Sequence, residues 1–305
     1  MKSNPSTLLV AAAAMACGGH AWAATLDGSI AGDGYGAAAA VQTVQTQFGD
    51  NASELNAAYA RIDGGVLYLA LTGNLESNFN KLNVFIDSTA GGQNVLTADA
   101  NNGGTNPEND NWANKHNGMT FDAGFEADYV ITMRNGGGST FDIDFATVGG
   151  GLGAFEAAGN VFGGSLTGSN AAALPGAGIG VAFDNSNAAG IVGGTGAADA
   201  SAAQAVQTGI ELAIPLSAIG NPAGPFKVSA MVNGSNHDFL SNQVLGGLPA
   251  GTGNLGGDGS GNFTGTLGGV DFNQFAGDQH FTVPEPTSLA LLGLGGLLVA
   301  RRRRG

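Results

Sequence analysis

Apolar and polar residues alternate with a period of two through most of this chain. The clearest case is Phe141, Ile143 and Phe145, which alternate with Asp142 and Asp144. The same alternation recurs at residues 66–71, 82–86, 129–134, 179–183, 210–214 and 226–232. Successive side chains of a strand point to opposite faces, so each segment predicts a β-strand with one apolar and one polar face. Clusters of Gly, Asn and Pro between the segments predict turns.

Sheets with one apolar face must bury that face against another layer. The pattern therefore predicts an all-β fold over residues 24–282, a two-sheet antiparallel β-sandwich that is jelly-roll-like and has Gly/Asn-rich loops. The residues expected inside include Phe141, Ile143, Phe145, Leu212, Ile214 and Val228. The polar face of each sheet is expected to meet water. Helical periodicity is weak, and it predicts only a short helix at residues 53–59 and one turn at residues 215–219.

The N-terminus has the three parts of a secretory signal peptide. Lys2 supplies the positive charge, residues 7–16 are apolar, and Ala21 and Ala23 form a small-x-small cleavage site. Cleavage is expected after Ala23, with Ala24 as the alternative. Cys17 raises the alternative of a lipoprotein signal, but Leu is missing three places before it. Since Cys17 is the only cysteine, the mature chain contains no disulfide and no thiolate metal site.

The C-terminus combines a proline-bracketed carboxylate, an apolar segment and a basic cluster. The motif is Val283, Pro284, Glu285 and Pro286, and its two prolines predict an exposed, non-helical segment. The cluster is Arg301, Arg302, Arg303 and Arg304. As a helix, residues 287–300 would be about 21 Å long, which is shorter than the roughly 30 Å of a bilayer core. Length alone would also suit a buried helix, but four adjacent arginines favour a membrane helix that stops at a basic face. The alternative is a basic tail on a soluble protein.

These parts, in this order at the chain end, resemble the PEP-CTERM sorting signal of exported bacterial proteins. The resemblance covers residues 283–305. It implies that the chain is held in the membrane by its C-terminal helix until an exosortase, a membrane transpeptidase-like enzyme, cuts it near the Pro-Glu-Pro motif. It also implies export to the cell envelope, the cell surface or the extracellular matrix. The three predicted regions are then residues 1–23, 24–282 and 283–305.

The charge of the chain is strongly acidic, with 24 Asp and Glu against 10 Lys and Arg. Without Lys2, the four C-terminal arginines and Glu285, five basic and 23 acidic residues remain, a net charge near −18. Such a surface repels phosphate backbones, which excludes nucleic acid as a partner. It suits a solvated extracellular protein, and one that attracts divalent cations.

A second resemblance lies in the body of the chain. Its residues are Leu26-Asp27-Gly28, Gly65-Val66-Leu67-Tyr68-Leu69 and Gly209-Ile210-Glu211-Leu212-Ala213-Ile214-Pro215. This order resembles family 9 carbohydrate-binding modules and related DOMON-like β-sandwiches over residues 25–235. It implies a sandwich fold and non-catalytic carbohydrate binding. The aromatic sugar clamp of such modules has no matching position in this chain.

Motifs for catalysis are missing from the mature chain. His116, His237 and His280 are isolated in sequence, and no Gly-x-Ser-x-Gly elbow occurs. Asp142 and Asp144 could act as paired carboxylates, but they are expected to be a solvated strand face. Residues 256–263 nearly match a calcium nonapeptide, yet Gly261 stands where Asp is needed, which favours a glycine-rich loop. We therefore expect no enzymatic activity.

The most informative loop covers residues 99–117. It contains seven asparagines, the acids Asp99, Glu108 and Asp110, and Trp112, the one tryptophan of the mature chain. Amide and carboxylate oxygens suit Ca²⁺, so the three acids are weak candidate ligands and Ca²⁺ is the candidate cofactor. An exposed Trp112 could instead stack on a sugar ring. The third alternative is a polar surface loop with Trp112 packed against the sandwich.

Three functions are consistent with these features. The first is an exported structural protein of the cell surface or extracellular matrix, sorted by an exosortase-type system, with extracellular polysaccharide such as a biofilm matrix as a candidate partner. The second is a non-catalytic carbohydrate-binding module. The third, disfavoured by the missing motifs, is a glycoside hydrolase.

Overall fold

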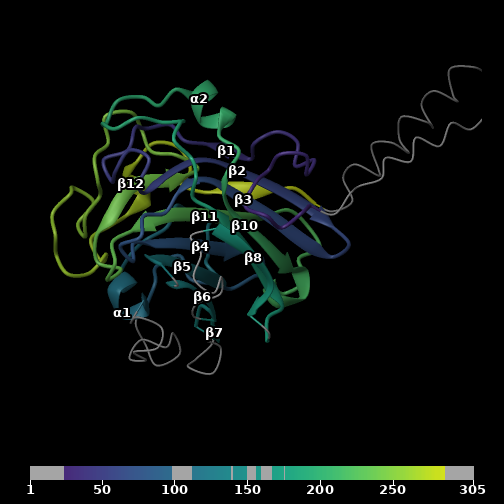
Figure 1. Cartoon of the computed structure of the whole chain (residues 1–305). Helices are drawn as coiled ribbons and strands as arrows, with labels where there is room; N and C mark the ends of the chain where they lie inside the picture. Colours follow the sequence, from purple (N-terminus) through teal and green to yellow (C-terminus); the bar gives the residue numbers. More distant parts are fainter. Residues whose placement is uncertain are drawn as a thin grey trace, which may run out of the picture.

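Two antiparallel β-sheets stacked face to face make up most of the structure, which is a computed structural model (Figure 1). It describes residues 24–97, 112–138, 140–149, 156–158, 167–174 and 176–285, with the backbone alone for residues 156–158 and 167–173. The first sheet has the strand order β1 (Ala40–Val41), β2 (Glu54–Asp63), β3 (Val66–Asn74), β10 (Gly209–Pro215), β9 (Ile179–Asp184) and β8 (Thr167–Leu174). The second has the order β12 (Leu240–Leu245), β11 (Phe226–Asn233), β4 (Lys81–Asp87), β5 (Tyr129–Gly137), β6 (Thr140–Thr147) and β7 (Glu156–Ala158), and β13 (Phe281–Val283) also pairs with β11. The predicted all-β sandwich is confirmed.

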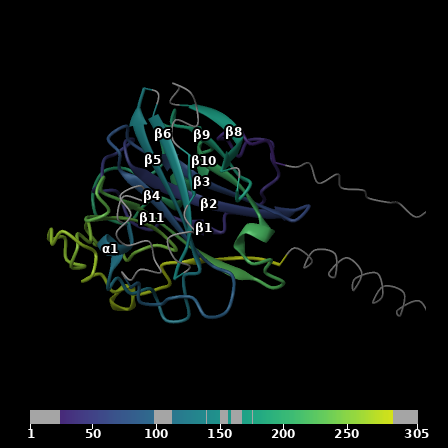
Figure 2. The same ribbon diagram turned by 90° about the horizontal axis from the view of Figure 1, so that it is seen from below.

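The connections mix local hairpins with long crossovers. β2 and β3 form a hairpin whose turn residues, Gly64 and Gly65, both have positive φ, as a two-residue turn of this kind requires. The chain then crosses to the second sheet for β4 to β7 and returns for β8, β9 and β10. The centres of both sheets pair distant segments, β3 with β10 and β4 with β11. The described chain begins and ends on the side opposite α1 (Trp112–His116), as both views show (Figures 1 and 2).

The main core fills the space between the sheets. The six residues singled out as expected inside are all buried there: Phe141, Ile143, Phe145, Leu212, Ile214 and Val228. They come from β6 and β11 of one sheet and β10 of the other, and they share this core with the leucines of β3. Burial of this apolar surface is the main force that stabilises the sandwich.

The outer faces of the sheets are covered as well, which corrects the expectation of two wet faces. Phe85, Val130, Met231 and Val244 on the outer face of the second sheet pack under loops, in a cluster that also contains Trp112, Phe121, Phe125 and Phe272. On the first sheet, Ala57, Tyr59 and Ala70 pack under Ala24 and Tyr35 of the N-terminal segment. Side chains that look exposed by their period are therefore buried by segments far away in sequence.

Two short-range expectations have opposite outcomes. The predicted helix at residues 53–59 is wrong, because these residues lead into and form β2, which pairs with β3 along its length. The predicted turn after Ile214 is confirmed by the 3-10 helix η4 (Leu216–Ile219). The remaining short helices of the described chain are α2 (Ala200–Ala205), capped by the Asp199 side chain, and η5 (Phe272–Gln274), capped by Asp271.

Candidate functional site

The sorting motif begins inside the folded body. β13 pairs with β11 in the register Phe226↔Val283 and Val228↔Phe281, and Val283 is only 1% exposed. Pro284 and Glu285 follow it and are exposed. The expectation that the whole motif is an exposed segment is thus corrected for Val283, which belongs to the core. A three-residue strand is too short for its alternation to be noticed in the sequence.

Several predicted signal residues lie outside the described residues. These are Ala21, Ala23, Pro286, Arg301, Arg302, Arg303 and Arg304. The apolar segment before the arginines lies outside them too. In the described part of the chain, no helix combines the length and the apolar character needed to cross a bilayer.

Trp112 is not the exposed platform that sugar stacking needs. It opens α1, is 2% exposed, and packs in the cluster on the outer face of the second sheet. This contradicts the alternative of an exposed Trp112 that stacks on a sugar, and it agrees with the alternative in which the ring packs against the sandwich. The candidate calcium ligands Asp99, Glu108 and Asp110 lie outside the described residues.

Two histidines that are far apart in sequence meet beneath α1. The rings of His116 and His237 are 5.3 Å apart, and both residues are fully buried. His116 donates from Nδ1 to the carbonyl of Trp112 at 2.7 Å, which leaves Nε2 facing Asn233 at 3.5 Å. Burial lowers the pKa of His116 to about 4 and lowers the pKa of His237 as well. Both rings are therefore neutral at neutral pH.

Asp142 and Asp144 form part of an ion-pair group rather than a solvated face. Arg134 on β5 donates from Nε to Asp142 at 3.0 Å and from Nη1 to Asp144 at 2.5 Å. The side chains of Arg134 and Asp144 are 13% and 5% exposed. The expected water-facing pair is thus corrected, because the guanidinium binds both carboxylates across neighbouring strands. Arg134 therefore binds one oxygen of each carboxylate, and the two acids belong to a largely buried ion-pair group.

In the glycine-rich loop at residues 256–263, the carboxylate of Asp258 accepts hydrogen bonds from residues of the same loop. Asp258 accepts from the amides of Ser260 and Asn262 at 2.9 and 3.1 Å and from the Asn262 side chain at 2.7 Å. These hydrogen bonds to the ionised form lower the pKa of Asp258. The loop therefore fits the prediction of a structural turn.

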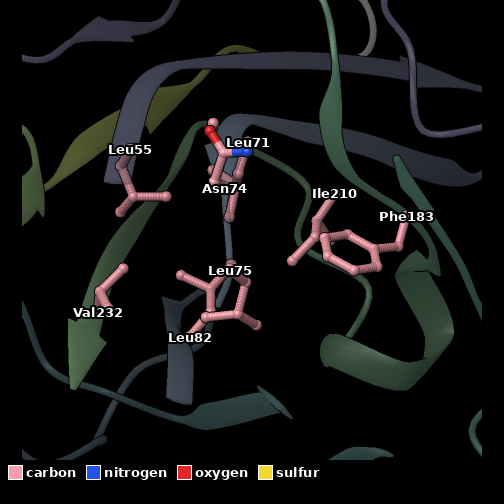
Figure 3. Close-up of a pocket in the computed structure, with 9 residues that line it drawn as sticks. Leu55, Leu71, Asn74, Leu75, Leu82, Phe183, Ile210 and Val232 are labelled. Carbon is pink, nitrogen blue, oxygen red and sulfur yellow. The ribbon is translucent and has the colours of Figure 1, made fainter. Parts of the chain in front are cut away.

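A small cavity lies between the sheets (Figure 3). It is lined mostly by apolar side chains, and the space open to the centre of a water molecule is about 10 Å³. Leu55, Leu75, Leu82 and Phe183 line it together with Asn74. Because a single water needs about 10–15 Å³ by this measure, the cavity has no room for a ligand.

Glu211 holds the N-terminal segment on the first sheet, a contact that sequence reasoning missed. Its Oε2 accepts from the amides of Asp27, Gly28 and Ser29 at 3.0, 2.7 and 3.2 Å, and its Oε1 accepts from the Tyr35 hydroxyl at 2.9 Å. Gly28 has φ +85°, and a Cβ there would lie 2.6 Å from the amide nitrogen of Asp184, so the turn needs glycine. The sequence feature that could have indicated this contact is Glu211 itself, a lone acid on the polar face of an otherwise apolar strand.

Comparison with known proteins identifies a sorting motif at the C-terminus. No curated protein and no solved structure matches the chain, and the resemblance to family 9 carbohydrate-binding modules stays a prediction. Residues 282–304 match the PEP-CTERM protein-sorting motif, which indicates export to the cell surface through an exosortase-type system.

Proposed function

We propose that this protein is a non-catalytic structural component of the cell surface or extracellular matrix. An exosortase-type enzyme would process it, and its C-terminal apolar helix would hold it in the membrane until then. The PEP-CTERM match supports the route. The covered sheet faces support a structural role, since a body whose outer faces are packed under loops is suited to a rigid surface module.

The continuity between sandwich and motif carries this proposal. β13 is hydrogen-bonded to β11 as far as Val283, and Pro284 follows directly. Residues 284–288 separate β13 from the apolar run, and five residues span at most about 18 Å. With the apolar run held in the membrane as proposed, the folded body would lie beside the membrane when the motif is processed. α1 lies on the opposite side of the sandwich (Figure 2), so we expect that side to face away from the membrane.

Intact-mass measurement of the protein from its native host tests this proposal. We expect the surface or matrix fraction to contain a chain that starts near Ala24 and ends within residues 284–286. Replacing the motif carboxylate, Glu285→Gln, should leave a longer chain with its arginines in the membrane fraction. Asp278→Asn is the matched control, because Asp278 is also exposed but lies outside the matched motif.

Two results would contradict the proposal. A surface fraction in which the wild-type chain retains Arg301 would contradict processing at the motif. Turnover of a polysaccharide by the purified protein would contradict the non-catalytic role. A pull-down with the native extracellular polysaccharide then distinguishes matrix association from simple display at the surface.

A further inference from the structure

Three carboxylates from distant parts of the chain converge on the outer face of the first sheet. Asp27 and Asp33 belong to the N-terminal segment, and Glu211 belongs to β10. One carboxylate oxygen from each lies within 4.8 Å of the others. On β10, Glu211 stands opposite Ala70 of β3 and Ala182 of β9, whose small side chains leave space for the N-terminal segment.

The hydrogen bonds at this cluster leave one oxygen unsatisfied. Asp33 Oδ1 accepts from the amide of Thr25 at 2.8 Å, and Asp27 Oδ1 accepts from the amide of Ser29 at 2.9 Å. Asp33 is only 5% exposed, and its Oδ2 has no hydrogen-bond partner within the described part of the chain. A buried carboxylate oxygen without a partner is costly and indicates a missing ligand.

The nearby cation, Arg61, is not the missing partner of Asp33 Oδ2. Arg61 donates from Nη1 to the backbone carbonyl of Asp33 at 2.6 Å, and its Nη2 forms an ion pair with Asp63 at 3.1 Å. The guanidinium thus serves other acceptors. Three carboxylates therefore lie close together, and one of their buried oxygens has no partner. Such a group needs either a shared proton or a bound cation.

We propose that Asp27, Asp33 and Glu211 bind a Ca²⁺ ion that fastens the N-terminal segment of the mature protein to β10. All candidate ligand atoms are oxygens, which suits a hard cation and not zinc. Asp27 is exposed, so water can complete the six to eight ligands that Ca²⁺ takes. Mg²⁺ demands a near-ideal octahedron and gives up its water reluctantly, so carboxylates from separate segments favour the more tolerant Ca²⁺.

Calcium titration of the exported, processed protein tests this site. After removal of divalent ions with a chelator, calorimetry should show a Ca²⁺ site, and Ca²⁺ should raise the melting temperature by several degrees over equal Mg²⁺. Asp33→Asn should weaken the affinity at least tenfold, because it removes the buried unpaired charge. Asp27→Asn, at an exposed position, is a second variant that leaves the packing intact.

Thermal melting in chelator tests whether the variants still fold. The amide oxygen introduced by Asp33→Asn can still accept from the backbone N–H of Thr25, so this variant should melt no lower than wild type without Ca²⁺. The control Asp258→Asn changes an acid whose hydrogen-bond partners lie in its own loop, and it should keep wild-type affinity.

Terbium luminescence locates the ion. Tyr35 donates to Glu211 at 2.9 Å, so excitation of this tyrosine should sensitise Tb³⁺ bound at the site. Tyr35→Phe should remove most of the emission because it removes the sensitising phenol. Ca²⁺ and Tb³⁺ should still compete for the site in this variant. Equal melting of the wild type in Ca²⁺ and chelator, or wild-type affinity in both Asp variants, would overturn the proposal. An equal response to Mg²⁺ would overturn the assignment to Ca²⁺.

Discussion

At the scale of single residues, buried charge in this protein is arranged in groups. Arg134 lies between Asp142 and Asp144, so two negative side chains share one guanidinium. A bidentate or bridging arginine is well suited to this because its donors lie in a fixed fork. The group holds β5 and β6 together on the outer face of the second sheet.

Removing Arg134 should be strongly destabilising. Arg134→Ala leaves two carboxylates, 16% and 5% exposed, without this partner, and we expect a loss of about 3–5 kcal/mol in unfolding free energy. Chemical denaturation measures the loss. Lys115→Ala is the comparison, because the Lys115 side chain is 31% exposed in its pair with Asp238, and it should cost about 1 kcal/mol or less. Equal costs would contradict the structural role of Arg134.

The buried histidines should make stability depend on pH. Burial depresses the pKa of His116 from 6.5 to about 4, so the native state keeps the ring neutral while the unfolded chain protonates. Stability from this group is complete above pH 6.5 and is lost as pH falls toward 4, by about 3 kcal/mol.

A difference profile separates the titration of His116, and its coupling to the neighbouring His237, from that of the other groups. Glu54 and Glu211 have raised pKa values and act in the opposite direction, but they are present in wild type and His116→Gln alike. The stability advantage of wild type over His116→Gln should therefore shrink between pH 6.5 and 4. Parallel pH profiles from denaturant titration would show that His116 does not titrate in this way.

At the scale of elements, tertiary pairing decides between helix and strand for β2. Its sequence, Glu-Leu-Asn-Ala-Ala-Tyr-Ala-Arg, contains good helix formers, but propensity is a weak prior. The Gly64-Gly65 turn and the long register with β3 provide a partner along the strand. Most of β2 is then buried on both faces, so the period of two is hidden.

β10 offers a sharp test of strand assignment. It lies between β3 and β9, and Ile214 is fully buried between the sheets. Ile214→Asp should lower the unfolding free energy by several kcal/mol, because the carboxylate would be buried without a partner. Ala213→Asp changes the neighbouring residue on the opposite, half-buried face and should cost much less. Thermal melting distinguishes the two, and an unchanged wild-type melting temperature in Ile214→Asp would contradict the assignment.

The stability of β13 should depend on the buried residues at its two ends, Phe281 and Val283. Val283→Ala removes two methyl groups from the core, and we expect a loss of about 2 kcal/mol and faster proteolysis near the motif. Thr282→Ala, at the exposed middle position of the same strand, should have little effect. If both variants resist protease as wild type does, β13 is not a stabilising strand.

At the scale of the whole molecule, folding depends on contacts between distant segments. The chain supplies β3 and β4 early and their partners β10 and β11 more than a hundred residues later. A chain that ends before Gly209 would leave β3 and β4 as exposed apolar edges, which favours aggregation. We expect that truncation to be insoluble or unfolded by circular dichroism, whereas a chain that ends at Glu285 should fold. A folded, soluble truncation would show that the two halves are independent.

The sequence alone determined the features whose signals are local. Period-two alternation identified the inner faces of both sheets, since strand geometry converts that period directly into sidedness. Composition and order at the two ends predicted the export and sorting signals, of which the PEP-CTERM motif is matched at residues 282–304. Such segments are recognised by their linear order, so the sequence suffices for them.

Only the tertiary structure decided what covers the sheets and which polar groups meet. Trp112 follows a polar, Asn-rich stretch and Val283 opens the sorting motif, so both look like surface residues in the sequence. Long-range packing nevertheless buries both. Asp27, Asp33 and Glu211 are separated by up to 184 residues, and they converge because β10 pairs with β3 and β9 beneath the N-terminal segment. The pairing of distant strands is set by the total apolar burial of the chain, which no local window of sequence contains.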